Sequence, residues 1–130
     1  MTPSRGSRTA VHPEGAATPA APLSPGVRIG NLLQVSGQVP VDGNGNLVGD
    51  TVREQTAQAM RNVLAVLAAG GASERDVLMF RIYLTDVAHF TEMNEVYSEF
   101  LSEPKPARTT VYVGLPPGKL VEIDALAVLP

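Results

Sequence analysis

The sequence predicts an α+β domain in which two helices pack against one mixed sheet, in the order β-β-β-α-β-α-β-β. One observation behind this prediction is apolar residues at helical spacing after Thr51 and again after Asp86. A second is the set of short apolar segments 77–84, 109–113 and 120–128, which have the length of strands. At 130 residues the chain is long enough for a single domain with one hydrophobic core.

Residues 1–21 are rich in Pro, Ala, Gly, Ser and Thr and carry no apolar period. Such a stretch buries too little apolar area to offset the entropy of ordering it. We therefore expect a disordered N-terminal tail over these residues, followed by one domain over residues 22–130.

The predicted domain begins with a hairpin of two short strands, 27–29 and 32–35, which turns at Gly30 and Asn31. Residues 42–46 are rich in Asn and Gly and predict a turn, because these residues supply the positive φ values that turns require. The segment 39–48 around this turn is therefore predicted to form another hairpin or a wide loop.

The first helix has signals at both ends. Thr51 and Glu54 have the spacing of a capping box, in which each side chain satisfies the backbone N–H of the other residue. The pair Gly70-Gly71 predicts the end of the helix, because glycine tolerates the left-handed conformation found there. Between these signals one apolar face repeats at helical spacing through Met60, Val63, Leu64 and Leu67.

The segment 77–84 is apolar on both faces, as expected for a central strand covered on two sides. Its one charge, Arg81, belongs to an anion site or, more simply, to an ion pair.

Asp86 caps a second helix, which Pro104 and Pro106 prevent from continuing. The apolar stripe of that helix is interpreted as core and consists of Phe90, Met93, Tyr97, Phe100 and Leu101. Two helices cannot cover both faces of the sheet, and an uncovered apolar face indicates an oligomer interface.

Composition excludes several classes of function. The chain has no cysteine and only two histidines, His12 and His89, so we expect no disulfide, no thiolate nucleophile and no metal site. A net charge of −3 and scattered basic residues argue against nucleic-acid binding. The longest apolar run, 63–69, is too short to cross a membrane, and no secretory signal is recognisable. A cytoplasmic location is therefore expected.

Arg108 and Glu122 are the candidate catalytic residues. Arg108 opens one predicted strand, where its planar guanidinium suits a carboxylate ligand. Glu122 shares a strand face with Asp124, opposite Val121 and Ile123. From this pattern alone, a solvated or ion-paired strand face is favoured over a catalytic pair.

Four segments in order resemble the signature segments of the Rid family (reactive intermediate deaminase, YjgF-type): Ser36-Gly37-Gln38-Val39-Pro40, Asn94-Glu95-Val96-Tyr97, Pro106-Ala107-Arg108-Thr109-Thr110 and Val121-Glu122-Ile123-Asp124-Ala125. The resemblance runs from about Pro22 to Val128. It implies a chorismate-mutase-like fold that assembles as a homotrimer, with the sheets forming a central barrel and clefts between subunits. It also implies hydrolysis of enamine or imine intermediates, such as 2-aminoacrylate, to 2-keto acids and ammonia without a metal or cofactor.

The resemblance also implies roles for single residues. Arg108 matches the arginine that pairs with the substrate carboxylate, and Glu122 matches the glutamate that positions the attacking water. Ser36 and Asn94 match polar positions that line the cleft, and Thr110 stands where many members have Cys or Thr.

One departure concerns Leu23, which stands where many deaminating members carry a tyrosine. It leaves open a more apolar substrate or a protein that binds a small carboxylate without turnover. A ribonuclease or translation inhibitor, which are activities attached to some members, is disfavoured by the acidic composition.

Overall fold

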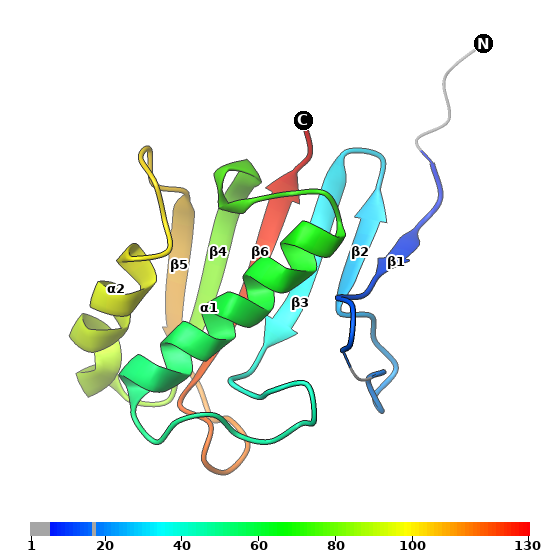
Figure 1. Cartoon of the computed structure of the whole chain (residues 1–130). Helices are drawn as coiled ribbons and strands as arrows, with labels where there is room; N and C mark the ends of the chain where they lie inside the picture. The colour runs from blue at the N-terminus through cyan, green and yellow to red at the C-terminus, as the bar shows by residue number, and fades with distance from the viewer. Residues whose placement is uncertain (1–5, 17) are drawn as a thin grey trace.

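A computed structural model describes residues 6–16 and 18–130 of the chain and contains one mixed sheet with both α-helices on one face (Figure 1). The strand order in the sheet is β1-β2-β3-β6-β4-β5. All neighbouring strands are antiparallel except β4 and β5, which are parallel. The strands are β1 (Thr9–Val11), β2 (Gly26–Ile29), β3 (Leu32–Gln38), β4 (Val77–Leu84), β5 (Ala107–Tyr112) and β6 (Val121–Val128).

The helices are α1 (Val52–Ala69) and α2 (Phe90–Ser98), with short 3₁₀ turns η1 (Glu74–Asp76) and η2 (Val87–His89). The capping box of α1 is confirmed, since Thr51 accepts from the Glu54 amide and Glu54 accepts from the Thr51 amide. The glycine stop is also confirmed, because Gly71 after the helix has φ +90°. Among the described residues, no helix is both long and apolar enough to cross a bilayer.

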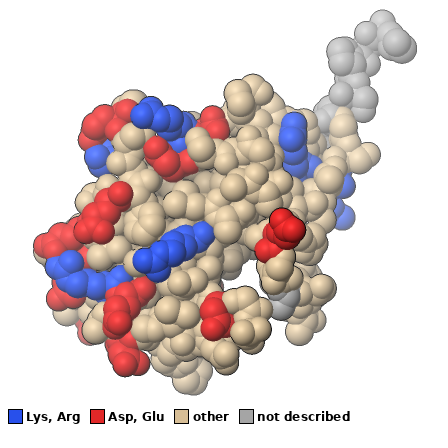
Figure 2. All heavy atoms as spheres, in the orientation of Figure 1, with Lys and Arg blue, Asp and Glu red and all other residues tan. Residues whose placement is uncertain are grey.

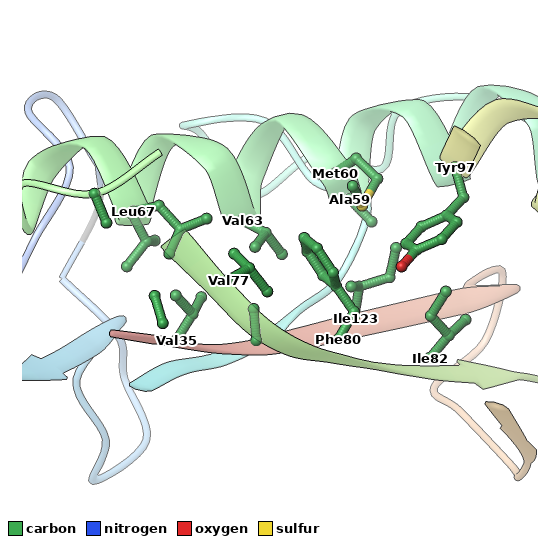
Figure 3. Packing of buried hydrophobic residues seen from close by; sticks show 14 of the residues in the cluster. Val35, Ala59, Met60, Val63, Leu67, Val77, Phe80, Ile82, Tyr97 and Ile123 are labelled. Carbon is green, nitrogen blue, oxygen red and sulfur yellow. The ribbon is translucent and has the colours of Figure 1, made fainter. Parts of the chain in front are cut away.

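The hydrophobic core fills the layer between α1, α2 and the sheet (Figure 3). Ala59, Met60, Val63 and Leu67 of α1 point toward the strands, and Tyr97 of α2 packs beside them. The sheet contributes alternate residues, which is the period of two expected for a strand with one covered face. These residues include Val35, Phe80, Ile82 and Ile123, all fully buried.

The structure differs from the prediction that β4 is covered on both faces. It lies inside the sheet between β6 and β5, but helices cover only one of its faces. Phe80 and Ile82 on the covered face are fully buried, whereas Leu78 is 58% exposed beside a register shift between Val77 and Met79. Within a single chain, the uniformly apolar sequence of β4 therefore does not mean burial on both faces.

The structure also differs from the prediction that residues 1–21 are a disordered tail. Residues Thr9–Val11 form β1, which pairs with β2, and Val11 enters the core. A disordered tail over residues 1–21 is therefore wrong for residues 9–11, because backbone pairing and a buried valine order them. Residues 1–5 and 17 of that predicted tail lie outside the described residues.

The element order is the expected one, but its first three strands include β1 and not residues 39–48. That segment is the wide loop of the two alternatives, closed by a single bridge between Val41 and Leu47. The hairpin β2–β3 and both C-terminal strands lie where the sequence predicts them.

Candidate functional site

Arg108 lies on β5, the edge strand of the sheet next to β4. Its partner across the parallel ladder is Phe80, a core residue, so Arg108 projects to the face that the helices cover. There the guanidinium carbon lies over two rings of α2, 5.0 Å from the centroid of Tyr97 and 5.6 Å from that of Phe90. These distances are within the range of cation–π contacts.

Helix α2 places Asn94 between these two rings. Phe90, Asn94 and Tyr97 are spaced i, i+4 and i+7, so they share one face of the helix. Thr110 is two residues after Arg108 on β5 and therefore projects to the same side of the sheet. Arg108, Asn94 and Thr110 therefore share the helix side of the sheet near the two rings, and we call these three residues the arginine group.

Three polar atoms of this neighbourhood are buried without a hydrogen-bond partner among the described residues: Oδ1 of Asn94, Oγ1 of Thr110 and the hydroxyl of Tyr97. Buried polar atoms in proteins are nearly always paired, so a cluster of unpaired ones indicates a place that a ligand or water completes. Burial also raises the pKa of Tyr97, while the nearby Arg108 charge lowers it.

Arg108 itself has no acidic partner among the described residues. The ion pairs that these residues form join Arg53 to Glu92 and Glu95, Arg81 to Asp124, and Lys105 to Glu103. The side chains of Lys and Arg lie among those of Asp and Glu on the helix-covered face (Figure 2). The N–H donors of the half-buried residue Arg108 are therefore not occupied by a carboxylate of the described residues and are available for an anion.

Glu122 lies on the other face of the sheet. Its partner in the ladder with β4 is Tyr83, and its neighbours Val121 and Ile123 are buried toward the helices. Burial is the larger cause that raises the pKa of the Glu122 carboxyl, and the negative charge of Asp124 raises it further. Such a group exchanges protons closer to neutral pH than an ordinary glutamate does.

Gly37 makes room for the Glu122 carboxylate. A Cβ atom at Gly37 would lie 2.8 Å from Oε2 and 2.9 Å from Cδ of Glu122, closer than real contacts allow. The glycine is therefore required by the position of the carboxylate, and not by its own backbone, which has no positive φ. Gly37 lies in the register shift between β3 and β6 that separates Val35 from Gln38.

Asp124 is the second carboxylate on this face, and each of its carboxylate oxygens accepts a hydrogen bond. Its Oδ1 accepts from Nε of Arg81 at 2.8 Å, and its Oδ2 accepts from the hydroxyl of Tyr83 at 2.8 Å. Arg81 thus belongs to an ion pair, the simpler of the two alternatives that the sequence left open. This network leaves Glu122 as the carboxylate of this face without such partners among the described residues.

Ser36 lies on β3 next to Gly37, and Leu23 lies near the same end of this strand. The hydroxyl of Ser36 donates to the carbonyl of Ser24 at 2.6 Å, which holds the segment that carries Leu23 against the strand. Leu23 is 54% exposed and lies at a pocket of about 350 Å³ that Gly37 and Gln38 also line. Ser36 therefore has a structural contact in addition to its predicted place in the cleft.

Four of the predicted site residues are consequently divided between opposite faces of one sheet. Arg108, Asn94 and Thr110 are together on the helix side, and Glu122 is on the open side, next to Gly37. Sequence reasoning did not identify Phe90 and Tyr97 as neighbours of Arg108, because their apolar stripe indicated core. The i, i+4, i+7 spacing around Asn94 was the available signal. The described residues contain no group of three or more His, Asp or Glu side chains able to hold a metal ion.

Comparison with known proteins places this arrangement in a family. The family model described as endoribonuclease L-PSP matches residues 14–129. A RutC family protein of Pyrococcus horikoshii is 42% identical over 116 residues, covering 88% of this chain and 92% of the relative. A RutC family protein of Saccharolobus solfataricus is 46% identical over 116 residues, covering 88% and 92%.

Solved structures agree with this assignment and with the expected fold. RidA of the Antarctic bacterium Psychrobacter has a TM-score of 0.86 at 34% identity, covering 93% of this chain and 99% of that chain. Escherichia coli TdcF with bound serine has a TM-score of 0.86 at 32% identity, covering 94% and 99%. The chain therefore belongs to the Rid family, whose family model carries the description endoribonuclease L-PSP, and it has that family's α+β fold.

Proposed function

We propose that this protein is a Rid-type deaminase that hydrolyses reactive enamine and imine intermediates, such as 2-aminoacrylate, to 2-keto acids and ammonia. The observation that carries the proposal is the unpaired, half-buried guanidinium of Arg108 beside the unpaired polar atoms of Asn94 and Thr110. A guanidinium without an internal carboxylate is suited to bind the carboxylate of a 2-imino acid through two parallel hydrogen bonds.

The chemistry requires little beyond positioning, because the imine carbon is already electrophilic. A water molecule adds to the carbon of the protonated imine and forms a neutral carbinolamine, while Glu122 accepts a proton from the water. Glu122 then returns this proton to the amino nitrogen, the carbon–nitrogen bond breaks with its electron pair leaving on ammonia, and the hydroxyl proton passes to Glu122 as the carbonyl of the 2-keto acid forms. A carboxyl group with a raised pKa suits both steps, because it takes up and releases protons nearer neutral pH.

The proposal requires more than one subunit per site, because Arg108 and Glu122 project from opposite faces of the sheet. We propose a homotrimer in which the arginine group of one subunit meets Glu122 of the next. The open face of the sheet supports this assembly, since apolar side chains on it remain uncovered in the single chain. Leu32, Val111 and Val128 are 48%, 39% and 36% exposed there.

A second candidate function is a binding protein of the same fold that holds a small carboxylate without turnover. Leu23 favours it, because it puts an exposed apolar side chain where many deaminases of the family have a tyrosine hydroxyl. The related TdcF structure contains bound serine, which is compatible with either candidate. Glu122, whose carboxyl group binding alone does not require, favours the deaminase.

The test generates 2-imino acids in place from several amino acids with an amino-acid oxidase and follows keto acid and ammonia. The purified protein should accelerate the release of both products. Arg108→Ala should abolish the acceleration, whereas Arg61→Ala, an exposed arginine of α1, should leave it unchanged. Tight binding of 2-keto acids without acceleration for small and large imines would reject the deaminase and support the binding protein.

A further inference from the structure

We infer that Phe90 and Tyr97 are positioning residues that hold the Arg108 guanidinium for carboxylate binding. This inference deepens the proposed function and rests on it, because it assumes that Arg108 is the carboxylate anchor. Arg108 is half-buried, yet among the described residues no carboxylate or carbonyl fixes its side chain.

An arginine side chain has several rotatable bonds, so a free one must lose conformational entropy when a ligand binds. Carboxylate partners would fix the side chain but would also use its N–H donors and neutralise its charge. Aromatic rings hold the cation through their π faces and use none of these donors. Two rings at 5.0 and 5.6 Å therefore order Arg108 and leave its hydrogen-bonding edge free for a ligand.

The two rings have different support. Tyr97 is only 6% exposed and meets Phe80 edge to face, with ring centroids 5.6 Å apart and an interplanar angle of 89°. Figure 3 shows the Tyr97 ring extending from α2 into the core beside Phe80. Phe80 is in turn the ladder partner of Arg108, so the core side chain beneath the arginine also orients the ring that holds it.

Phe90 is the outer ring and is 39% exposed at the start of α2. Its ring contacts Arg108, so the exposed aromatic at this position covers one side of the guanidinium. The hydroxyl of Tyr97 has no partner among the described residues, and the side chain contacts Arg108 through its ring face.

The experiment measures the dissociation constant of 2-oxobutanoate by calorimetry for the wild type and for variants. Phe90→Leu and Tyr97→Leu should each weaken binding about fivefold, the effect expected from losing one cation–π contact. Tyr97→Phe retains the ring and should bind 2-oxobutanoate more tightly than Tyr97→Leu does. Met93→Leu, a buried change on the same helix outside the arginine contact, is the control for core packing.

A spectroscopic readout separates positioning from stability. The ring currents of Phe90 and Tyr97 should shift the Nε proton signal of Arg108 upfield in the wild type, and each leucine variant should reverse part of that shift. Phe90→Leu is the decisive variant, because an exposed ring can be removed without a cavity in the core.

The outcomes distinguish the inference from the proposed function. If the wild type and Arg108→Ala bind 2-oxobutanoate equally, Arg108 is not the carboxylate anchor, and the proposed function loses its basis. If Arg108→Ala loses binding but Phe90→Leu and Tyr97→Leu keep the wild-type affinity, the inference is overturned and the proposed function stands. In turnover with imines, the leucine variants should raise KM more than they lower kcat, because carboxylate anchoring acts before and during the reaction.

Discussion

Arg108 and Glu122 project from opposite faces of the same sheet. Arg108 is paired with the core residue Phe80 on the helix side, and Glu122 is paired with Tyr83 on the open side. Strand β4 lies between the strands that carry them, so no movement of side chains within one chain can bring both onto one ligand. A site that uses both residues must be completed by a second copy of the chain.

This relationship predicts that two inactive variants complement each other. In the proposed trimer, mixing Arg108→Ala with Glu122→Ala produces sites with Arg108 from one variant and Glu122 from the other, and such sites are intact. Random mixing in equal amounts should restore about one site in four, if each site takes one residue from each of two neighbouring subunits. The measurement is imine hydrolysis by variants that are unfolded and refolded together.

The control for complementation is a mixture of the same variants without refolding, which should stay inactive while subunits do not exchange. Refolded mixtures with no activity, although each variant assembles, would contradict a site shared between subunits. A mass near that of the 13.7 kDa monomer in solution would contradict it independently.

The sequence predicted α1 and the inner strands well, because each has local signals. The prediction for α2 was only partly correct, because Asp86 caps the turn η2 before it and the helix ends at Ser98, before Phe100 and Leu101 of its predicted stripe. The capping box at Thr51 and the alternation in β6 depend on neighbours within a few residues. Strand β1 could not be predicted, because Thr9–Val11 are ordered by pairing with β2 and by burial of Val11, and the flanking composition contains neither signal. Local pattern also could not show that residues 39–48 close with a single bridge.

In the candidate site too, the sequence predicted the residues but not the features that depend on the pairing of distant strands. The residues predicted for it are present, but their distribution over two faces follows from strand register, which pairs Phe80 with Arg108 and Tyr83 with Glu122. Register is a property of the whole sheet and is not written in any one segment. The place of Gly37 against Glu122 likewise depends on a register shift between β3 and β6.

Gly37→Ala should impair catalysis more than stability. The added Cβ would lie 2.8 Å from the Glu122 carboxylate, which is the far end of a flexible side chain and can move away. If Glu122 acts on the attacking water as proposed, its displacement should lower kcat about 10- to 100-fold, in line with the cost of small misplacements in active sites. Gly114→Ala is the control, because a Cβ there meets nothing within 4 Å. Equal kcat for both variants and the wild type would show that the position of Glu122 is not critical.

The raised pKa of Glu122 predicts a pH-dependent gain in stability for Glu122→Gln. The folded protein binds this proton more tightly than the unfolded chain does. The stabilisation from the proton is therefore complete below the unfolded pKa and is lost as pH rises through the folded pKa. Glutamine mimics the protonated form, so the variant should melt at a higher temperature than the wild type near pH 7 and at nearly the same temperature near pH 4.

Glu103→Gln provides a control of opposite sign for this melting series. Pairing with Lys105 lowers the pKa of Glu103, so its contribution to stability is present above the unfolded pKa and is lost as pH falls through the folded pKa. This exposed pair should change the melting temperature only slightly.

In the wild type, the pKa read from the acidic limb of the kcat/KM pH profile should lie above the ordinary range of a glutamate. A limb at or below that range would contradict Glu122 as the catalytic base.

The network around Asp124 should stabilise the open face of the sheet. Asp124→Ala leaves Arg81 and Tyr83 without their acceptor and should lower the free energy of unfolding by about 2 kcal/mol, whereas Tyr83→Phe should cost about 1 kcal/mol. The double variant should cost less than the sum, because both changes remove the same hydrogen bond. Strict additivity in denaturant unfolding would show that the two side chains do not interact.

Gln55 should be one of the most sensitive polar positions in the chain, although on sequence it is an ordinary helix residue. Its Nε2 donates to the carbonyls of Gly49 and Gly118 at 3.1 and 2.8 Å, and its Oε1 accepts from the amide of Leu120 at 2.7 Å. Gln55→Leu leaves these backbone groups unpaired and should lower the free energy of unfolding by about 3 kcal/mol. The measurement is urea unfolding, with Arg61→Leu on the exposed face of α1 as a control expected to change stability little. Equal effects of the two substitutions would show that water replaces Gln55 at no cost. A large effect of Gln55→Leu alone would establish that this side chain fastens the loops before α1 and before β6 to the helix.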